Sequence, residues 1–337
     1  MKRFCILFIF IKLISCYTTN NNLPLYNYWN CIGFKNDIKK DKPYVFNVGE
    51  IPLIAWKSND TIISTLNACK HMGSKLDKGK ICNGNLLCPY HGIKHNVDDK
   101  CGIIKEFDDK LWWSYNPINE NIPKIPYNQK NYISSYLTID MDESLPYAIY
   151  NSMDLNHPEF IHNGLGFGEK EAAKNYKMHQ YDDKIGISFD YTAKNTVKHL
   201  NYDMKIDDLT NNYNEVIYPS TTWSRVSIPE DKEKNIIIGV SMLPIEENLT
   251  RWFITIRHNY MTNFIGKNVM IEATKYILNQ DKNQFKSQIK NKELKDFVSW
   301  KKMLKFENHL SILNKYYKGY NYPKIGDFIE ELKKDKW

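Results

Sequence analysis

The stretch Asn67–His95, NACKHMGSKLDKGKICNGNLLCPYHGIKH, holds two short motifs with metal-binding side chains. Cys69 and His71 form a C-x-H pair, and Cys88 and His91 form a C-x-x-H pair after sixteen intervening residues. Two thiolates and two imidazoles on two loops suit a two-iron cluster that has cysteine on one iron and histidine on the other. A four-coordinate structural zinc site could use the same four ligands.

The residues that flank the four candidate ligands favour iron. Pro89 stiffens the second loop, while Gly73 and Gly92 relieve backbone crowding, so that amides can turn toward sulfur. Together with the ligand spacing, the CPYHG run resembles the Rieske [2Fe–2S] domain. This resemblance implies that the four cysteine and histidine side chains hold a [2Fe–2S] cluster.

Length and composition predict about two domains with a real hydrophobic core. The chain has 337 residues, of which 42% are hydrophobic, and its formal charge of +7 is spread over single lysines. Without an arginine-rich block or a basic face, nucleic acid is not an expected partner. A basic surface suits an acidic donor of the ferredoxin type or an anionic membrane surface. Cysteines without regular spacing argue against a disulfide scaffold and predict a reducing compartment.

Composition changes along the chain predict three parts. Residues 1–22 form a signal-like or targeting leader, which could be cleaved or stay as a membrane anchor, because Met1–Cys16 is basic and then mostly apolar. A plastid or membrane-associated location follows as an expectation. Residues 23–126 form the Rieske-like domain, which ends in the proline-bearing linker Pro117–Pro126, and residues 127–337 form the second domain.

The pattern of apolar and turn residues predicts the fold class α+β. In the first domain, β-rich runs separated by turns predict a small antiparallel β domain with its metal loops at one tip, with strands at Tyr44–Val48, Ile51–Trp56, Thr61–Leu66, Lys94–Val97 and Leu111–Tyr115. The second domain is expected to be a helix-grip-like unit, a curved antiparallel sheet wrapped on a long helix. Its predicted strands are Tyr132–Ile139, Gly186–Thr192, Met204–Ile206, Glu215–Tyr218, Thr222–Ile228, Asn235–Pro244 and Arg251–Arg257, and its predicted helices are Leu145–His162 with a break, Phe264–Gln288 and Ile325–Lys334.

A second candidate metal site lies in Asn151–His162, NSMDLNHPEFIH. Asp154, His157 and His162 form D-x-x-H-x4-H, and two histidines with a later carboxylate are typical of the non-haem Fe(II) facial triad that activates dioxygen. Residues five apart fall on different faces of an ideal helix, but Pro158 breaks the helix after His157. Two surface histidines beside a helix end are the alternative interpretation.

A Rieske-like domain followed by D-x-x-H-x4-H resembles the Rieske non-haem iron oxygenases over nearly all the chain after the leader. The resemblance implies that His157 and His162 bind iron and that Asp154 bridges to His91 of an adjacent chain in a ring, most simply a homotrimer. Asn151 matches the N-x-x-D form of the pheophorbide a oxygenase-like branch and is interpreted as a residue that supports the ligands.

The third iron ligand is expected on the late helix. Asp281 has Ile277 and Phe285 one turn on either side, so its carboxylate points inward, where an unpaired charge would be costly without a metal. Leu278–Gln288 is also similar to the family's Q/E-D-x6-Q helix. A solvated helix aspartate beside Lys282 is the alternative, and the fallback ligands are Asp296 and Glu272. The remaining histidines lack partners at ligand spacing and are interpreted as surface or core residues: His95, His179, His199, His258 and His309.

The expected function is that of an oxidoreductase, a Rieske-type mono- or dioxygenase that hydroxylates, demethylates or desaturates a hydrophobic ring substrate. The resemblance implies a chlorophyll derivative such as pheophorbide a, with sterols as the alternative. A separate ferredoxin or flavin/ferredoxin reductase must supply electrons, because the chain has no G-x-G-x-x-G dinucleotide site. Two further hypotheses remain: an electron-transfer protein with an inactive second iron site, and a zinc-stabilised binding module.

Overall fold

The structure, a computed structural model, describes residues 24–127, 129–162, 173–192, 209–228, 231–291, 294 and 307–335. The predicted leader and the predicted strand Met204–Ile206 lie outside these residues. Among the described helices, none is both long and apolar enough to cross a membrane.

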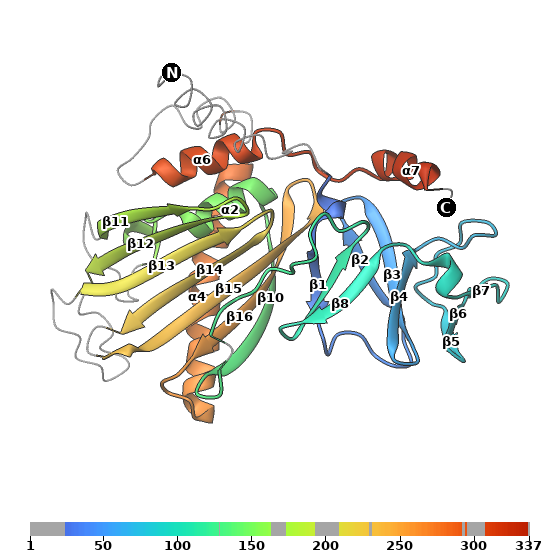
Figure 1. Cartoon of the computed structure of the whole chain (residues 1–337), viewed down its shortest axis with the longest axis horizontal. Helices are drawn as coiled ribbons and strands as arrows, with labels where there is room; N and C mark the ends of the chain where they lie inside the picture. Colours follow the sequence, from blue (N-terminus) through green and yellow to red (C-terminus); the bar gives the residue numbers. More distant parts are fainter. Residues whose placement is uncertain are drawn as a thin grey trace, which may run out of the picture.

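The first domain consists of three small antiparallel sheets of three strands each (Figure 1). Its fully buried Trp56 and Trp113 come from strands of two different sheets. The sheets have the orders β1(Asn30–Phe34)–β9(Lys110–Ser114)–β8(Ile103–Phe107), β2(Tyr44–Val48)–β3(Ile51–Ser58)–β4(Thr61–Leu66) and β5(Lys80–Cys82)–β6(Asn85–Leu87)–β7(Lys94–His95). The third sheet carries the metal loops at the tip of the domain, as expected.

Most predicted strands of this domain are present, and four strands were not predicted. The predicted strand Lys94–Val97 is shorter than expected, because only Lys94–His95 pairs with β6 and a 3-10 helix, η2, follows at Val97–Asp99. The side chain of Asn96 accepts the N–H of Asp98, which begins that helical turn. The unpredicted strands β1, β5, β6 and β8 are short, and β8 is mostly exposed, so hydrophobic alternation signals them weakly.

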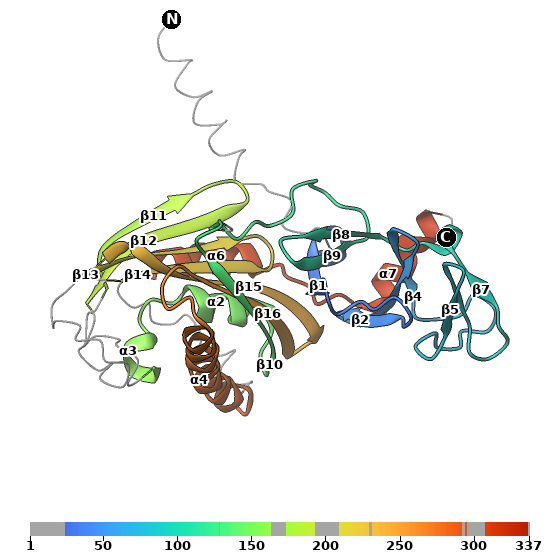
Figure 2. The same ribbon diagram turned by 90° about the horizontal axis from the view of Figure 1, so that it is seen from below.

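The second domain is a seven-stranded antiparallel sheet that curves over a long helix, α4(Phe264–Ile289) (Figure 2). The expected fold class is therefore confirmed. The strand order is β10(Ile133–Met141)–β16(Leu249–His258)–β15(Asp231–Glu246)–β14(Thr221–Ile228)–β13(Leu209–Ile217)–β12(Lys184–Thr192)–β11(Ala173–Gln180).

Helix α4 packs on the sheet through one face, because its buried residues recur at helical spacing. Met270, Thr274, Leu278, Asp281 and Phe285 form one buried stripe. Asn263 caps the N-terminus of the helix, because its side chain accepts the N–H of Gly266 at 2.7 Å and satisfies one free amide of the first turn. The same core contains residues of α2(Leu145–Met153) and α6(Asn308–Tyr317).

The predicted break in Leu145–His162 is present. Helix α2 ends at Met153, and a single turn, α3(Pro158–Ile161), begins at the proline. Asp154 is extended between them, and its Oδ1 accepts the N–H of Asn156 at 2.7 Å. This break turns His157 and His162 toward the same space as α4.

The C-terminal helix α7(Ile325–Lys334) forms as predicted but packs on the first domain. Phe328 and Leu332 share a core with Tyr26 and Trp113 of that domain, and α7 lies beside its strands in Figure 1. The same core also contains Leu243 and Phe253 of the second domain, so α7 packs where the two predicted domains meet. Its apolar residues predict a helix, but they do not indicate which surface they cover.

Candidate metal centres

The two cysteine–histidine loops have the same backbone turn. The N–H of Gly73 donates to the carbonyl of Cys69 at 2.7 Å, and the N–H of Gly92 donates to the carbonyl of Cys88 at 2.9 Å. Both glycines have positive φ, 70° and 67°, a region that other residues rarely adopt. The turns thus bring the two cysteines and the two histidines to one tip of the domain.

The donor set of this tip fits a two-iron cluster. Cys69 and Cys88 are buried and not joined by a disulfide, while His71 and His91 are exposed, with ring centroids 5.1 Å apart. Burial opposes ionisation of Cys88, but the backbone N–H groups of Tyr90 and His91 hold the pKa of its thiol below the usual value. The thiolate is the form that binds metal. Buried thiolates with outer imidazoles match cysteine on one iron and histidine on the other.

One residue at this tip was not predicted to act there. His95 is buried, as the core interpretation allowed, but it is not without a partner, because its Nε2 lies 3.4 Å from the Sγ of Cys69. Its Nδ1 lies 3.6 Å from Oδ2 of Asp99. Sequence spacing gave no signal for this contact, because it joins the strand after the second loop to the cysteine of the first loop.

At the other end of the molecule, where α3 and α4 lie (Figure 2), the structure brings together His157, His162 and Asp281. One ligand atom from each residue lies within 4.8 Å of the others. Oδ1 of Asp281 is 3.7 Å from Nε2 of His157 and 3.5 Å from Nε2 of His162, and the two rings are nearly perpendicular at 80°. Two imidazoles and one carboxylate that converge on one point form a 2-His-1-carboxylate site.

The protonation tendencies of these residues fit a bound cation. Burial raises the pKa of Asp281, although His157 and His162 oppose that shift, so the carboxylate lacks sufficient positive charge nearby. Burial lowers the pKa of His162, which favours the neutral, ligating form. Burial also opposes the charged form of His157, but Asp154 and Asp281 raise its pKa overall. A divalent cation held by these three side chains would supply the positive charge that the carboxylate of Asp281 lacks.

Neighbouring side chains hold two of the three candidate ligands. Oε1 of Gln280 lies 3.1 Å from Nδ1 of His162, and Nδ2 of Asn151 donates to Oδ1 of Asp281 at 3.4 Å. Asn151 thus has the supporting position that its motif predicts. The interaction of Gln280 with His162 was not predicted, although Gln280 belongs to the helix motif that contains Asp281. Such contacts orient metal ligands.

Asp154 lies beside this site without joining its ligand atoms. Its Oδ2 is 3.6 Å from Nδ1 of His157, and its side chain is 25% exposed, so it can meet another molecule. His157 holds the pKa of Asp154 below its usual value against the effect of burial. Of the fallback ligands, Glu272 is exposed and paired with Lys275 at 2.8 Å, and Asp296 lies outside the described residues.

Among the other histidines, His309 supports the segment that precedes Asp154. It is buried, its Nε2 lies 2.7 Å from the carbonyl of Met153, and its Nδ1 lies 3.0 Å from the hydroxyl of Tyr176. Of the other three histidines, two contact no candidate metal ligand among the described residues, and the third lies outside those residues. His179 contacts Ser188, His258 contacts the carbonyl of Tyr260, and His199 is not described.

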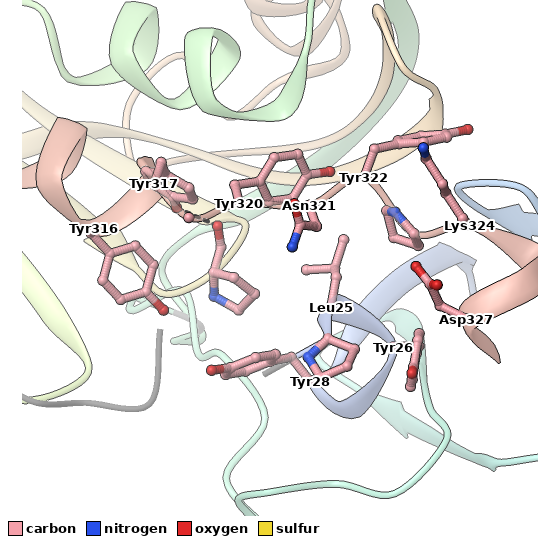
Figure 3. A pocket seen from close by; sticks show the side chains of 14 residues that line it. Leu25, Tyr26, Tyr28, Tyr316, Tyr317, Tyr320, Asn321, Tyr322, Lys324 and Asp327 are labelled. Atoms are coloured by element: carbon pink, nitrogen blue, oxygen red, sulfur yellow. Dashed lines mark hydrogen bonds between the residues drawn. The ribbon is translucent and has the colours of Figure 1, made fainter. Parts of the chain in front are cut away.

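Two hollows in the described part of the chain lie away from both candidate sites. In Figure 3, the tyrosines Tyr316, Tyr317 and Tyr320 face Leu25 and Tyr28 across a cavity of about 190 Å³. A wider hollow of about 530 Å³ adjoins it and is bounded by the linker between the domains. None of the candidate metal ligands lines either one.

Two family models match successive parts of the chain. The Rieske [2Fe-2S] domain matches residues 28–110, and the vanillate O-demethylase oxygenase C-terminal domain matches residues 144–304. The first match contains the four candidate ligands of the cluster, and the second contains the three candidate ligands of the mononuclear site. The chain thus contains a Rieske [2Fe-2S] domain followed by an oxygenase C-terminal domain, the pair of domains found in Rieske non-haem iron oxygenases. The [2Fe–2S] cluster and the mononuclear iron are the cofactors that its two domains imply.

Curated relatives match over limited regions. The oxygenase component of 3-ketosteroid-9-alpha-monooxygenase from Rhodococcus rhodochrous is 30% identical over 77 residues, which is 23% of this chain and 20% of that protein. Chloroplastic chlorophyllide a oxygenase from Oryza sativa subsp. japonica is 23% identical over 159 residues, 42% of this chain and 29% of that protein. The matched regions thus span less than a third of either relative.

Solved structures share the fold over most of the chain. Dicamba monooxygenase bound to 3,6-dichlorosalicylic acid superposes with a TM-score of 0.74 at 16% identity, covering 87% of this chain and 96% of that one. NdmA from Pseudomonas putida CBB5 with caffeine has a TM-score of 0.66 at 15% identity, covering 87% and 89%. At these identities the likeness concerns the fold alone.

Proposed function

We propose that this protein is an oxygenase that uses O2 and externally supplied electrons to oxidise a hydrophobic ring substrate. The observation that carries the proposal is the convergence of His157, His162 and Asp281, whose ligand atoms lie within 4.8 Å of one another, in a chain that also holds the two cysteine–histidine loops. A 2-His-1-carboxylate site leaves open coordination positions, and iron bound there supplies the activation of dioxygen. An electron-transfer protein would not need this triad.

The chain's own residues have distinct tasks in this proposal. His157 and His162 would hold the metal through their imidazoles, and Asp281 would hold it through its carboxylate. Gln280 orients His162 through its Nδ1, and Asn151 orients the carboxylate of Asp281. Burial of the triad, with His162 only 3% exposed, excludes bulk water from the side of the site that faces the core.

We also propose that the working form contains several copies of the chain, most simply a homotrimer. In one copy, the cluster tip beside β5–β7 and the turn α3 lie at opposite ends of the molecule (Figure 2). Exposed apolar side chains adjoin both ends, with Tyr90 and Met72 at the cluster tip and Phe160 on α3. A second copy could bring His91 to the partly exposed Asp154, as the family resemblance implies. A separate ferredoxin or flavin reductase would supply the electrons.

For the substrate, we propose a chlorophyll derivative such as pheophorbide a or chlorophyllide a. The match to chlorophyllide a oxygenase supports this class because it extends over 159 residues and so reaches beyond the Rieske-like region. The alternative is a steroid or sterol, which the more similar but shorter match to 3-ketosteroid-9-alpha-monooxygenase supports. Both classes are flat, hydrophobic ring systems.

Turnover with isotopically labelled oxygen tests the proposal. The iron-loaded protein would be supplied with NADPH, a ferredoxin reductase and a plant-type ferredoxin, and then incubated under 18O2 with pheophorbide a, chlorophyllide a or a sterol. The proposal expects a product of one class, formed at the expense of O2 and absent with Asp281→Asn. Reduction of the cluster without any product from these substrates would favour the electron-transfer alternative.

A further inference from the structure

The cysteine of the first cluster loop, Cys69, contacts a histidine that the spacing of the sequence motifs does not indicate as its partner. His95 lies on β7, directly opposite Leu86 of β6, and its side chain is only 2% exposed. From there its Nε2 reaches the Sγ of Cys69 at 3.4 Å. A nitrogen–sulfur distance of this length is that of a hydrogen bond to sulfur, because sulfur is larger than oxygen.

The ring has little freedom to turn away from this contact. Its Nδ1 lies 3.6 Å from Oδ2 of Asp99. Asp99 is held in turn, because it accepts the N–H of Asn96 at 3.1 Å and pairs with Lys70 at 2.7 Å. Lys70 sits between Cys69 and His71, so one network ties the first loop, η2 and the ring together. Because Lys70 balances the charge of Asp99, the carboxylate does not require a proton on Nδ1.

We infer that His95 is a positioning residue for the cluster, which donates a hydrogen bond from Nε2 to the Sγ of Cys69 and thereby raises the reduction potential. An iron-bound thiolate only accepts hydrogen bonds, so the nitrogen that faces it must carry the ring's proton. Reduction adds negative charge to the cluster and its sulfur ligands, and a hydrogen-bond donor stabilises that charge. Hydrogen bonds to the sulfurs are one of the factors that set the potential of such clusters.

The test compares two nearly isosteric replacements in the cluster-loaded full chain. His95→Gln retains an N–H donor near the position of Nε2, whereas His95→Met fills a similar volume without a donor. Redox titration followed by EPR gives the midpoint potential of each. We expect His95→Met to have a lower potential than His95→Gln, with the unsubstituted protein closer to His95→Gln. Equal potentials, or the reverse order, would overturn the inference.

A control variant and a spectroscopic measurement on the unsubstituted protein accompany this comparison. His179→Phe removes a histidine far from the cluster and should leave the potential unchanged. If the His95 variants fail to load the cluster, protein labelled with 15N at histidine gives the answer. Pulsed EPR of its reduced cluster should show the couplings of His71 and His91 and a third, weaker nitrogen coupling from His95. Absence of the third coupling would contradict the hydrogen bond.

None of these measurements depends on substrate turnover. An inactive protein whose potential still responds to His95→Met would count against the proposed oxygenase activity and not against this inference.

Discussion

Nε2 of His162, at the end of α3, lies 3.5 Å from Oδ1 of Asp281, in the middle of α4. Both side chains are almost fully buried, and burial shifts the pKa of each toward its neutral form. A buried neutral imidazole and a carboxylate short of compensating charge form a poor pair by themselves. With His157 on the third side, they form a binding site that a divalent metal completes.

The carboxylate of Asp281 should be required for binding of the mononuclear iron. Asp281→Asn keeps the size of the side chain but removes its negative charge, so it should lose the mononuclear iron and leave the cluster intact. Iron should fall from about three to about two per chain, while sulfide stays at about two. Glu272→Gln, an exposed position on the same helix, is the control and should change neither. Retention of the third iron in Asp281→Asn would remove Asp281 from the ligand set.

Gln280 should affect the same iron more weakly. Gln280→Leu removes the partner of His162 Nδ1, so the ring loses its fixed orientation. Loss of such a supporting contact typically costs about 10–100-fold in metal affinity. The measurement is competition with an iron chelator, and the neighbouring exposed Asn279→Leu is the matched control. If both variants hold iron as tightly as the unsubstituted protein, the contact has no role in binding.

Asp154 should matter for electron delivery and not for metal content. Its carboxylate is 3.6 Å from Nδ1 of His157 and partly exposed, but it is not one of the converging ligand atoms. Asp154→Ala should therefore keep both metals and lose most of the turnover. Metal analysis and the rate of substrate oxidation on the same sample separate the two effects. Full activity in Asp154→Ala would show that electrons do not need this residue.

A buried lysine at the boundary between the domains makes stability depend on pH in a defined direction. Lys110 is fully buried, its Nζ lies 3.3 Å from Oγ of Ser241, and burial lowers its pKa from 10.5 to about 8. Between pH 8 and 10.5 the unfolded chain therefore binds the proton that the folded chain has released. Through this group alone, the free energy of unfolding rises with pH across that window.

Lys110→Met isolates this contribution from those of other buried groups. At pH 7 the variant lacks a charge whose burial costs roughly 3 kcal/mol, so it should be the more stable protein. Its advantage should shrink as pH rises from 8 to 10.5. Urea unfolding over this range, with the exposed Lys100→Met as control, measures the difference. An advantage that does not change with pH would mean that Lys110 titrates normally.

Much of the candidate chemistry could be predicted from sequence, because its residues come in local motifs. The two cysteine–histidine pairs and the D-x-x-H-x4-H segment each lie on one short piece of chain. Asp281 required only the apolar residues one turn away, which indicate an inward-facing position on a helix. The break before Pro158 followed from the missing amide of proline.

Contacts between distant segments could not be predicted in the same way. The contact between His95 and Cys69 crosses two loops, and Arg257 of β16 holds the linker through the carbonyl of Ile125 at 2.7 Å. Likewise, Phe328 and Leu332 mark an apolar face on α7, but only the fold shows that this face covers the first domain. Local periodicity indicates that a side chain is buried and leaves its partner undetermined.

The metal content of the protein, purified without oxygen, tests both candidate metal sites most directly. Iron and acid-labile sulfide would be measured per chain, together with the EPR spectrum after reduction with dithionite. We expect about three irons and two sulfides per chain with a Rieske-type signal. Two irons that added Fe(II) does not raise to three would contradict the His157–His162–Asp281 site, and zinc without sulfide would contradict the cluster as well.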